Sequence, residues 1–230
     1  LSDSESLGEE HILTWKQRKA IPGELGQNIS WRHSSRARSV RNWRNCYAAG
    51  VRKFDRRLGV FLDFLRDKGL MDNSIIVFTS DHGEELFDHG GWAHSHTLYA
   101  ELLRVPMLIR LPKGERGGRI IAETIGLVDI MPTLMTMAGV TRPVSGMAGR
   151  DLSGVLQNTD TKSDPFLVFG SGTRHAPQMV SAQSNRFKLI WNYPKGDIRL
   201  FDLYMDPCEK RDIGSDYPEA IEEYSRWVGD

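Results

Sequence analysis

A dense group of side chains that can carry chemistry occupies residues 79–96. It contains two aspartates, two glutamates and four of the seven histidines of the chain: His82, His89, His94 and His96. Imidazoles and carboxylates are ligands for divalent cations, and a histidine can also transfer a proton near neutral pH. The segment is therefore the first place to expect a functional site.

Asp81 and His82 stand directly after Ile75–Phe78, a wholly apolar run typical of a strand buried on both faces. In open α/β sheets, ligands bind beyond the carboxyl ends of the strands, where these two side chains would lie. A carboxylate and an imidazole there can hold a divalent cation, which can polarise an anionic ester oxygen. A His- and Gly-rich surface loop is the alternative, and the histidines nearby make it less favourable.

The elements that must position this group begin with a helix. Apolar residues at steps of three and four from Val40 to Leu65 predict a long amphipathic helix with one buried stripe, which ends at Gly69. Two more strands are predicted at 105–110 and 124–128. The next predicted helix has Asp129 as its N-cap.

The pattern changes after about residue 160. Four short β-type runs, at 166–169, 178–183, 186–192 and 198–203, are separated by tight turns, which predicts antiparallel pairing. A last amphipathic helix is predicted over Pro218–Val228. The predicted fold class is α/β, with a mostly parallel sheet flanked by helices, a small C-terminal antiparallel sheet and a terminal helix.

The predicted organisation has three parts. Residues 1–39 form an irregular connecting segment with a short helix near Ile12–Lys19, residues 40–160 form the α/β part, and residues 161–230 form the antiparallel subdomain.

Composition excludes several classes of protein. The 230 residues carry 30 basic and 30 acidic side chains, so the sequence has no electrostatic footprint for nucleic acid. Two cysteines exclude a disulfide-dense scaffold and leave the compartment open. No apolar stretch approaches the ~18–20 residues of a membrane span.

Five segments carry a resemblance to a known family. Their order and spacing resemble the sulfatase family, within the alkaline phosphatase superfamily, from about residue 40 to the end. The segments are Ile75–Glu84, His94–Arg110, Leu127–Leu134, Ser184–Ile190 and Leu200–Pro207.

The resemblance implies roles for four residues. Asp81 and His82 are expected to bind one divalent cation. The family favours Ca²⁺, whereas the imidazole of His82 also suits Mn²⁺ or Zn²⁺. His94 is the candidate that contacts the sulfate and protonates the leaving oxygen, with His96 as the alternative. The implied substrate is a small-molecule or glycan sulfate ester.

Neighbouring residues have more ordinary predicted roles. Asp88 and His89 are expected to stabilise the loop. Glu101 and Arg104, three apart on a helix, are expected to form a structural ion pair.

The expected nucleophile is missing from the sequence. Sulfatases use a formylglycine made from the Cys of a Cys-x-Pro/Ala/Ser-x-Arg motif, which neither Cys46 nor Cys208 fits. The chain is therefore expected to be the C-terminal part of a longer enzyme. We expect it to be inactive alone and to associate with its missing N-terminal half or with a second copy.

Two other functions stay open. His82 also suits a metal-dependent phosphodiesterase, phosphonate hydrolase or phosphoethanolamine transferase of the same superfamily. A catalytically inactive fragment that acts only with a partner chain is the third hypothesis.

Overall fold

The computed structural model describes residues 33–140, 146–157, 167–172 and 178–229. The chain divides into two compact units, residues 1–47 and 48–230. The helix expected near Ile12–Lys19 and most of the expected connecting segment lie outside the described residues.

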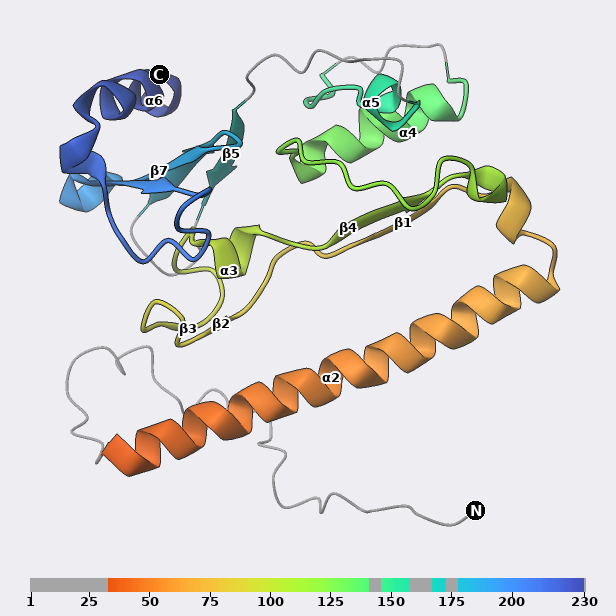
Figure 1. Ribbon diagram of the computed structural model, residues 1–230, viewed down its shortest axis with the longest axis horizontal. Coiled ribbons are helices and arrows are strands. Elements are labelled where there is room, and N and C mark those ends of the chain that lie inside the picture. Colours follow the sequence, from red (N-terminus) through yellow and green to blue (C-terminus); the bar gives the residue numbers. More distant parts are fainter. Residues whose placement is uncertain (1–32, 141–145, 158–166, 173–177, 230) are drawn as a thin grey trace. The chain divides into compact units, whose positions relative to one another are not determined.

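The first described element is α2, a helix over His33–Asp67 (Figure 1). It begins seven residues before Val40, where the apolar periodicity starts. Its end matches the expectation, since Gly69 has φ of +67°. The amide of Leu70 donates to the carbonyl of Leu65, and that of Gly69 donates to Arg66. This is the Schellman arrangement, which favours glycine.

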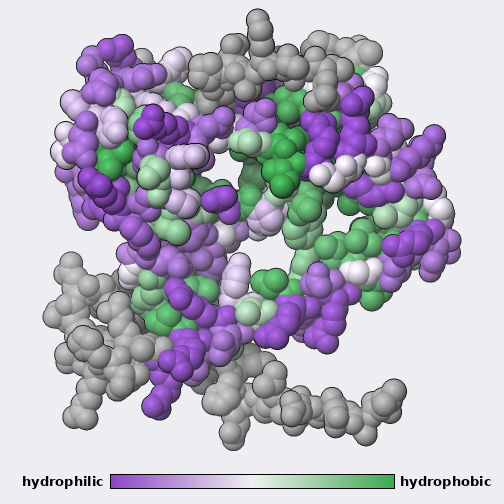
Figure 2. Space-filling view, viewed as in Figure 1, coloured by the Kyte–Doolittle hydropathy of each residue, from purple (hydrophilic) through white to green (hydrophobic). Residues whose placement is uncertain are grey.

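No residue of the apolar stripe of α2 is fully buried, so the prediction of a buried stripe is wrong for the described residues. Val51, Phe54 and Phe61 keep 51–54% of their surface accessible, and Leu58 and Leu65 are only partly buried. Figure 2 shows hydrophobic residues reaching the surface beside charged ones. Periodicity reveals an apolar face, but it does not reveal whether the same chain supplies a partner for that face.

Residues 80–106, which contain the dense group of histidines and acids, lie between two strands, β1 (Ile76–Thr79) and β4 (Met107–Arg110). They pair antiparallel, with Ile76 opposite Arg110 and Thr79 opposite Met107. The α/β class is confirmed, but all strand pairs in the described ranges are antiparallel, whereas a mostly parallel sheet was expected. The same residues, 80–106, connect the two strands and include the candidate site.

The four C-terminal strands form one antiparallel sheet in consecutive order, as predicted. Helix α6 packs on this sheet, and its Tyr224 joins a core with Ala182, Leu189 and Leu200. The bounds are β5 Val168–Ser171, β6 Met179–Gln183, β7 Phe187–Asn192, β8 Asp197–Asp202 and α6 Pro218–Gly229. Among the described helices, none has both the length and the apolarity needed to cross a bilayer.

Between β4 and β5 along the chain, the predicted strand at 124–128 does not form. A 3-10 turn over Leu127–Asp129 leads instead into α4 (Ile130–Met137), and α5 (Ser153–Gln157) follows. Asp129 does not cap α4 with its side chain. Its buried carboxylate accepts hydrogen bonds from the amide of Gly126 (2.9 Å), the amide of Arg150 (2.7 Å) and the guanidinium of Arg150 (3.0 Å). Asp129 therefore ties its own turn, from Gly126, to the loop at Arg150, which sequence spacing does not reveal.

The variant Asp129→Ala should lower the free energy of unfolding of the intact protein by about 3 kcal/mol. The substitution removes the acceptor of two amides and the carboxylate paired with the partly buried Arg150 guanidinium, which keeps the carbonyl of Thr124. Asp151→Ala is the control, because the Asp151 carboxylate belongs to an exposed residue that caps the amide of Ser153 (2.8 Å) and hydrogen-bonds the side chains of Ser153 and Thr136, and loss of such a cap costs about 1 kcal/mol. Urea denaturation measures both, and equal losses would contradict the bridging role of Asp129.

Candidate active site

The candidate site is built on a short hairpin between β1 and α3 (Ala100–Leu103). Strands β2 (Glu85–Leu86) and β3 (Trp92–Ala93) pair with Glu85 opposite Ala93. This register places Glu84, just before β2, beside His94, just after β3. Residues ten positions apart are thereby brought together where the apolar strand β1 ends.

Asp81 and His82 lie together at that end, as the sequence predicted. The Asp81 side chain is 87% exposed, and one of its oxygens lies 3.8 Å from Nε2 of His82. The other ring nitrogen, Nδ1, is hydrogen-bonded to the carbonyl of Gly83 at 2.7 Å. A carbonyl can only accept, so Nδ1 donates, and in the neutral ring Nε2 keeps its lone pair. This is the arrangement of a histidine oriented for a metal ion.

A third and a fourth side chain join this pair. His82, Glu84 and His94 offer ligand atoms that all lie within 4.8 Å of one another. Nδ1 of His94 lies 3.1 Å from the Glu84 carboxylate, and the rings of His82 and His94 are 4.3 Å apart. Sequence reasoning singled out His94 but missed Glu84. The hairpin register is the only signal that could have identified it, and two-residue strands leave little trace in a sequence.

His96 has a different environment from His94. Its Nε2 is hydrogen-bonded at 2.7 Å to Glu85, whose side chain is completely buried. The same carboxylate accepts the amides of Gly91 (2.6 Å) and His89 (3.1 Å). Glu85 thereby closes the hairpin from inside, and His96 is one of its three donors.

The Glu85–His96 pair is charged over a wide pH range. Burial opposes ionisation of Glu85, but the hydrogen bonds from His96, Gly91 and His89 outweigh it and lower the pKa of Glu85. The hydrogen bond from Glu85 raises the pKa of His96 against the effect of burial. The stabilisation is lost as the pH falls through the lowered pKa of Glu85, and again as it rises through the raised pKa of His96.

Gly91 is required by this closure. A Cβ atom on Gly91 would lie 2.5 Å from Nε2 of His96 and 2.6 Å from the Glu85 carboxylate. Gly83 is equally constrained, because its Cβ would lie 1.9 Å from the carbonyl oxygen of Glu101. The glycines of the segment therefore allow close packing of the hairpin on α3.

His89 holds the outer turn of the hairpin, in agreement with its predicted loop-stabilising role. Its Nδ1 is hydrogen-bonded to Glu101 at 2.7 Å and its Nε2 to the carbonyl of Glu209 at 2.8 Å. The ring stacks on Tyr99 with centroids 3.7 Å apart. The expected Glu101–Arg104 pair is replaced by Glu101–His89, because α3 is short and Glu101 faces the hairpin.

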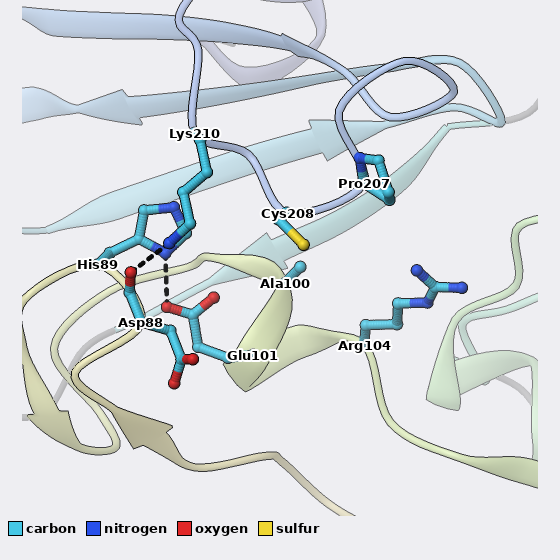
Figure 3. Close-up of a pocket in the computed structure, with 8 residues that line it drawn as sticks. All are labelled: Asp88, His89, Ala100, Glu101, Arg104, Pro207, Cys208 and Lys210. Carbon is cyan, nitrogen blue, oxygen red and sulfur yellow. Dashed lines mark hydrogen bonds and ion pairs between the residues drawn. The ribbon is translucent and has the colours of Figure 1, made fainter. Parts of the chain in front are cut away.

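A pocket of about 310 Å³ lies beside this contact (Figure 3). Figure 3 shows the His89–Glu101 contact on one side and the Cys208 thiol near Ala100. Lys210 donates to the carbonyl of Asp88 on the same side of the pocket as His89. Cys208 thus lines the same pocket as residues of α3 and of the hairpin turn. It is not one of the residues of the His82–Glu84–His94 cluster.

Comparison with known families places this geometry in context. The sequence matches the sulfatase family over residues 10–140. It matches the family described as N-sulphoglucosamine sulphohydrolase, C-terminal, over residues 88–223. The second match includes most of the hairpin and the whole C-terminal sheet.

Individual relatives agree with these matches. The chain is 32% identical over 193 residues to the N-acetylglucosamine-6-O-sulfatase of Bacteroides thetaiotaomicron, covering 80% of this chain and 33% of that protein. The chain is also similar to a solved structure of another protein, described as bound to that protein's own substrate, D-glucosamine-2-N,6-O-disulfate; the TM-score is 0.64 at 29% identity, over 76% of this chain and 37% of the other.

The phosphonate monoester hydrolase of Agrobacterium radiobacter shares the fold. Its TM-score is 0.64 at 24% identity, over 76% of this chain and 38% of the other. The chain spans about a third of the length of the curated relatives that it matches. These matches, over more than half of its residues, establish that the chain belongs to the sulfatase family and corresponds to a C-terminal portion of its members.

Proposed function

We propose that the whole protein hydrolyses sulfate esters of small molecules or glycans, and that residues 81–96 supply part of its catalytic centre. The observation that carries this proposal is the convergence of His82, Glu84 and His94 beside the exposed carboxylate of Asp81. Family membership supports the reaction class. Similarity to a protein whose stated substrate is a glucosamine disulfate supports a sulfated sugar as the substrate.

Asp81 and His82 would hold one divalent cation. The donor set fits, because an accessible carboxylate stands beside an imidazole whose Nδ1 is engaged and whose Nε2 has a free lone pair. Carboxylate oxygen suits Ca²⁺, the ion that the family favours, and imidazole suits Mn²⁺ or Zn²⁺. Held by these two residues, the cation would supply positive charge beside the sulfate oxygens of a bound ester.

His94 would deliver the proton to the departing alcohol oxygen. Glu84 fixes the ring through Nδ1, which leaves Nε2 to face the ester. Nε2 of His96 is already committed to buried Glu85, so His96 would position the hairpin and not transfer the proton. This argument favours His94 over the alternative that the sequence left open.

The nucleophile would be a formylglycine outside these 230 residues. Cys46 lies on α2, Cys208 lies on the pocket beside α3, and neither stands in the required motif. We therefore propose that the chain alone is inactive. The N-terminal half of the protein or a second copy would supply the missing residues and cover the exposed apolar face of α2.

A phosphodiester or phosphonate ester is the second candidate substrate. The observation that favours it is the imidazole-rich cluster, with His82 beside His94, which suits a transition metal better than Ca²⁺. The two candidates differ in the atom attacked and not in the predicted roles of Asp81 and His82.

The variant Asp81→Ala should lower kcat/KM of the intact protein for an aryl sulfate by about a hundredfold or more, because a ligand of the cation is lost. The bound divalent metal, measured by elemental analysis, should fall in parallel. Asp72→Ala is the control, since Asp72 is also a largely exposed carboxylate just before β1, where it pairs with Arg110 at 3.4 Å. Unchanged metal content and turnover in Asp81→Ala would refute the assignment.

The variant His94→Gln should affect substrates according to their leaving groups. A sugar alcohol needs a proton to depart, so turnover of a sugar sulfate should fall by about a hundredfold or more. Nitrophenolate leaves unprotonated, so turnover of nitrophenyl sulfate should fall much less. His96→Gln serves as the comparison and should reduce both rates by the same factor. If His96→Gln shows the selective loss instead, the two roles are reversed.

Turnover of paired substrates distinguishes the two candidate reactions. The intact protein should hydrolyse an aryl sulfate with a kcat/KM at least about tenfold above that for the matching aryl phosphodiester, a difference of about 1.4 kcal/mol in transition-state stabilisation. Assays at equal pH and metal concentration measure the ratio. A ratio in the opposite direction would favour the phosphodiesterase.

A further inference from the structure

Glu209 is a buried acid that the proposed chemistry does not use. It follows β8 in the C-terminal subdomain, and its side chain is 1% exposed. One carboxylate oxygen accepts from Nζ of Lys188 on β7 at 2.8 Å, and the Lys188 side chain is fully buried. The other oxygen accepts from the amide of Ala100, the first residue of α3, also at 2.8 Å. The carboxylate thus joins the C-terminal sheet to the start of α3.

The backbone of Glu209 makes a third connection. Its φ is +54°, a left-handed conformation that costs energy for any residue with a side chain. In this conformation its carbonyl accepts from Nε2 of His89, and its amide donates to the carbonyl of Asp206. One residue therefore contacts the hairpin turn, α3 and β7 at once.

A continuous series of hydrogen bonds connects Glu209 to the hairpin of the candidate active site. Glu209 holds the ring of His89, and the amide of His89 donates to Glu85. Glu85 in turn binds Gly91 and His96, on either side of β3. His94 follows β3 directly, so its position depends on the hairpin that these contacts fix.

Stability alone is a poor explanation for a buried pair of this kind. Removing two charges from water costs about as much as their attraction returns, and apolar side chains of similar volume often serve equally well. Burial lowers the pKa of Lys188, and the charge of Glu209 opposes that shift. Apolar replacements could not form the directional hydrogen bonds that fix the orientation of α3 and of the hairpin relative to the C-terminal sheet.

We propose that Glu209 is a positioning residue for the active site, and that it fixes the β2–β3 hairpin and α3 against the C-terminal sheet through His89, Ala100 and Lys188. The part of this proposal that concerns catalysis rests on the proposed sulfate ester hydrolysis. Glu209 does not contact the substrate, so its removal should displace His94 without removing any group that binds the ester.

Hydrogen exchange in the intact protein tests the structural part. Glu209→Gln keeps the size of the side chain but loses its charge, and amides in residues 85–103 should exchange at least about tenfold faster. Amides of β5–β8 should change much less. Asp202→Asn is the matched control, because Asp202 pairs with Arg186 (3.1 Å) in the same sheet and contacts only that sheet and its following turn among the described residues. It should not accelerate exchange in 85–103.

A second variant keeps the test valid if Glu209→Gln does not fold. His89→Phe retains an aromatic ring over Tyr99 and loses both hydrogen bonds of the imidazole. It should accelerate exchange in the same residues. If exchange of 85–103 in both variants, or in the one that folds, matches that in Asp202→Asn, the proposal is wrong.

Kinetics of the same variants test the catalytic part. Glu209→Gln should lower kcat for an aryl sulfate by about tenfold while KM changes less than about twofold. A loss of activity that tracks the fraction of folded protein would overturn the positioning role. If the wild-type protein hydrolyses no sulfate ester, the proposed function fails, and the exchange experiment still decides whether Glu209 positions the hairpin.

Discussion

The buried carboxylate of Glu85 is the constraint on which the candidate site depends. An ionised group without water must find donors, and Glu85 takes them from the amides of His89 and Gly91 and from the ring of His96. The hydrogen bonds to the Glu85 carboxylate hold the hairpin closed. In the closed hairpin Glu84 lies beside His94, and both lie near His82. The arrangement of the chemical groups is thus a consequence of burying one charge that does no chemistry itself.

The C-terminal sheet supports the candidate site indirectly, by holding the hairpin that Glu85 closes. The antiparallel strands β6–β8 form a well-packed core around Leu189 and Leu200, while the hairpin has two-residue strands that could not hold their own geometry. Contacts through Glu209 and His89 connect the weak element to the strong one. This explains why a subdomain distant in sequence from Asp81 belongs to the same functional unit.

Much of the fold follows from the sequence, because alternating apolar residues and tight turns specify strands β6–β8 and α6 locally. The position of Asp81 and His82 was also predictable, from an apolar strand that ends in ligand residues, whereas His94 was singled out through the family resemblance. The antiparallel pairing of β1 with β4 was not, since an apolar run carries no direction. Glu84 and Glu209 were missed because their contacts depend on register and on neighbours 10 and 109 residues away.

The central claim is that Asp81 and His82 bind a catalytic divalent cation beside His94. The most direct measurement is an anomalous difference map from crystals of the intact protein grown with Mn²⁺. Our account predicts a single strong peak within about 2.5 Å of an Asp81 oxygen and of Nε2 of His82. A well-occupied peak elsewhere, with Asp81 and His82 free of metal, would contradict it.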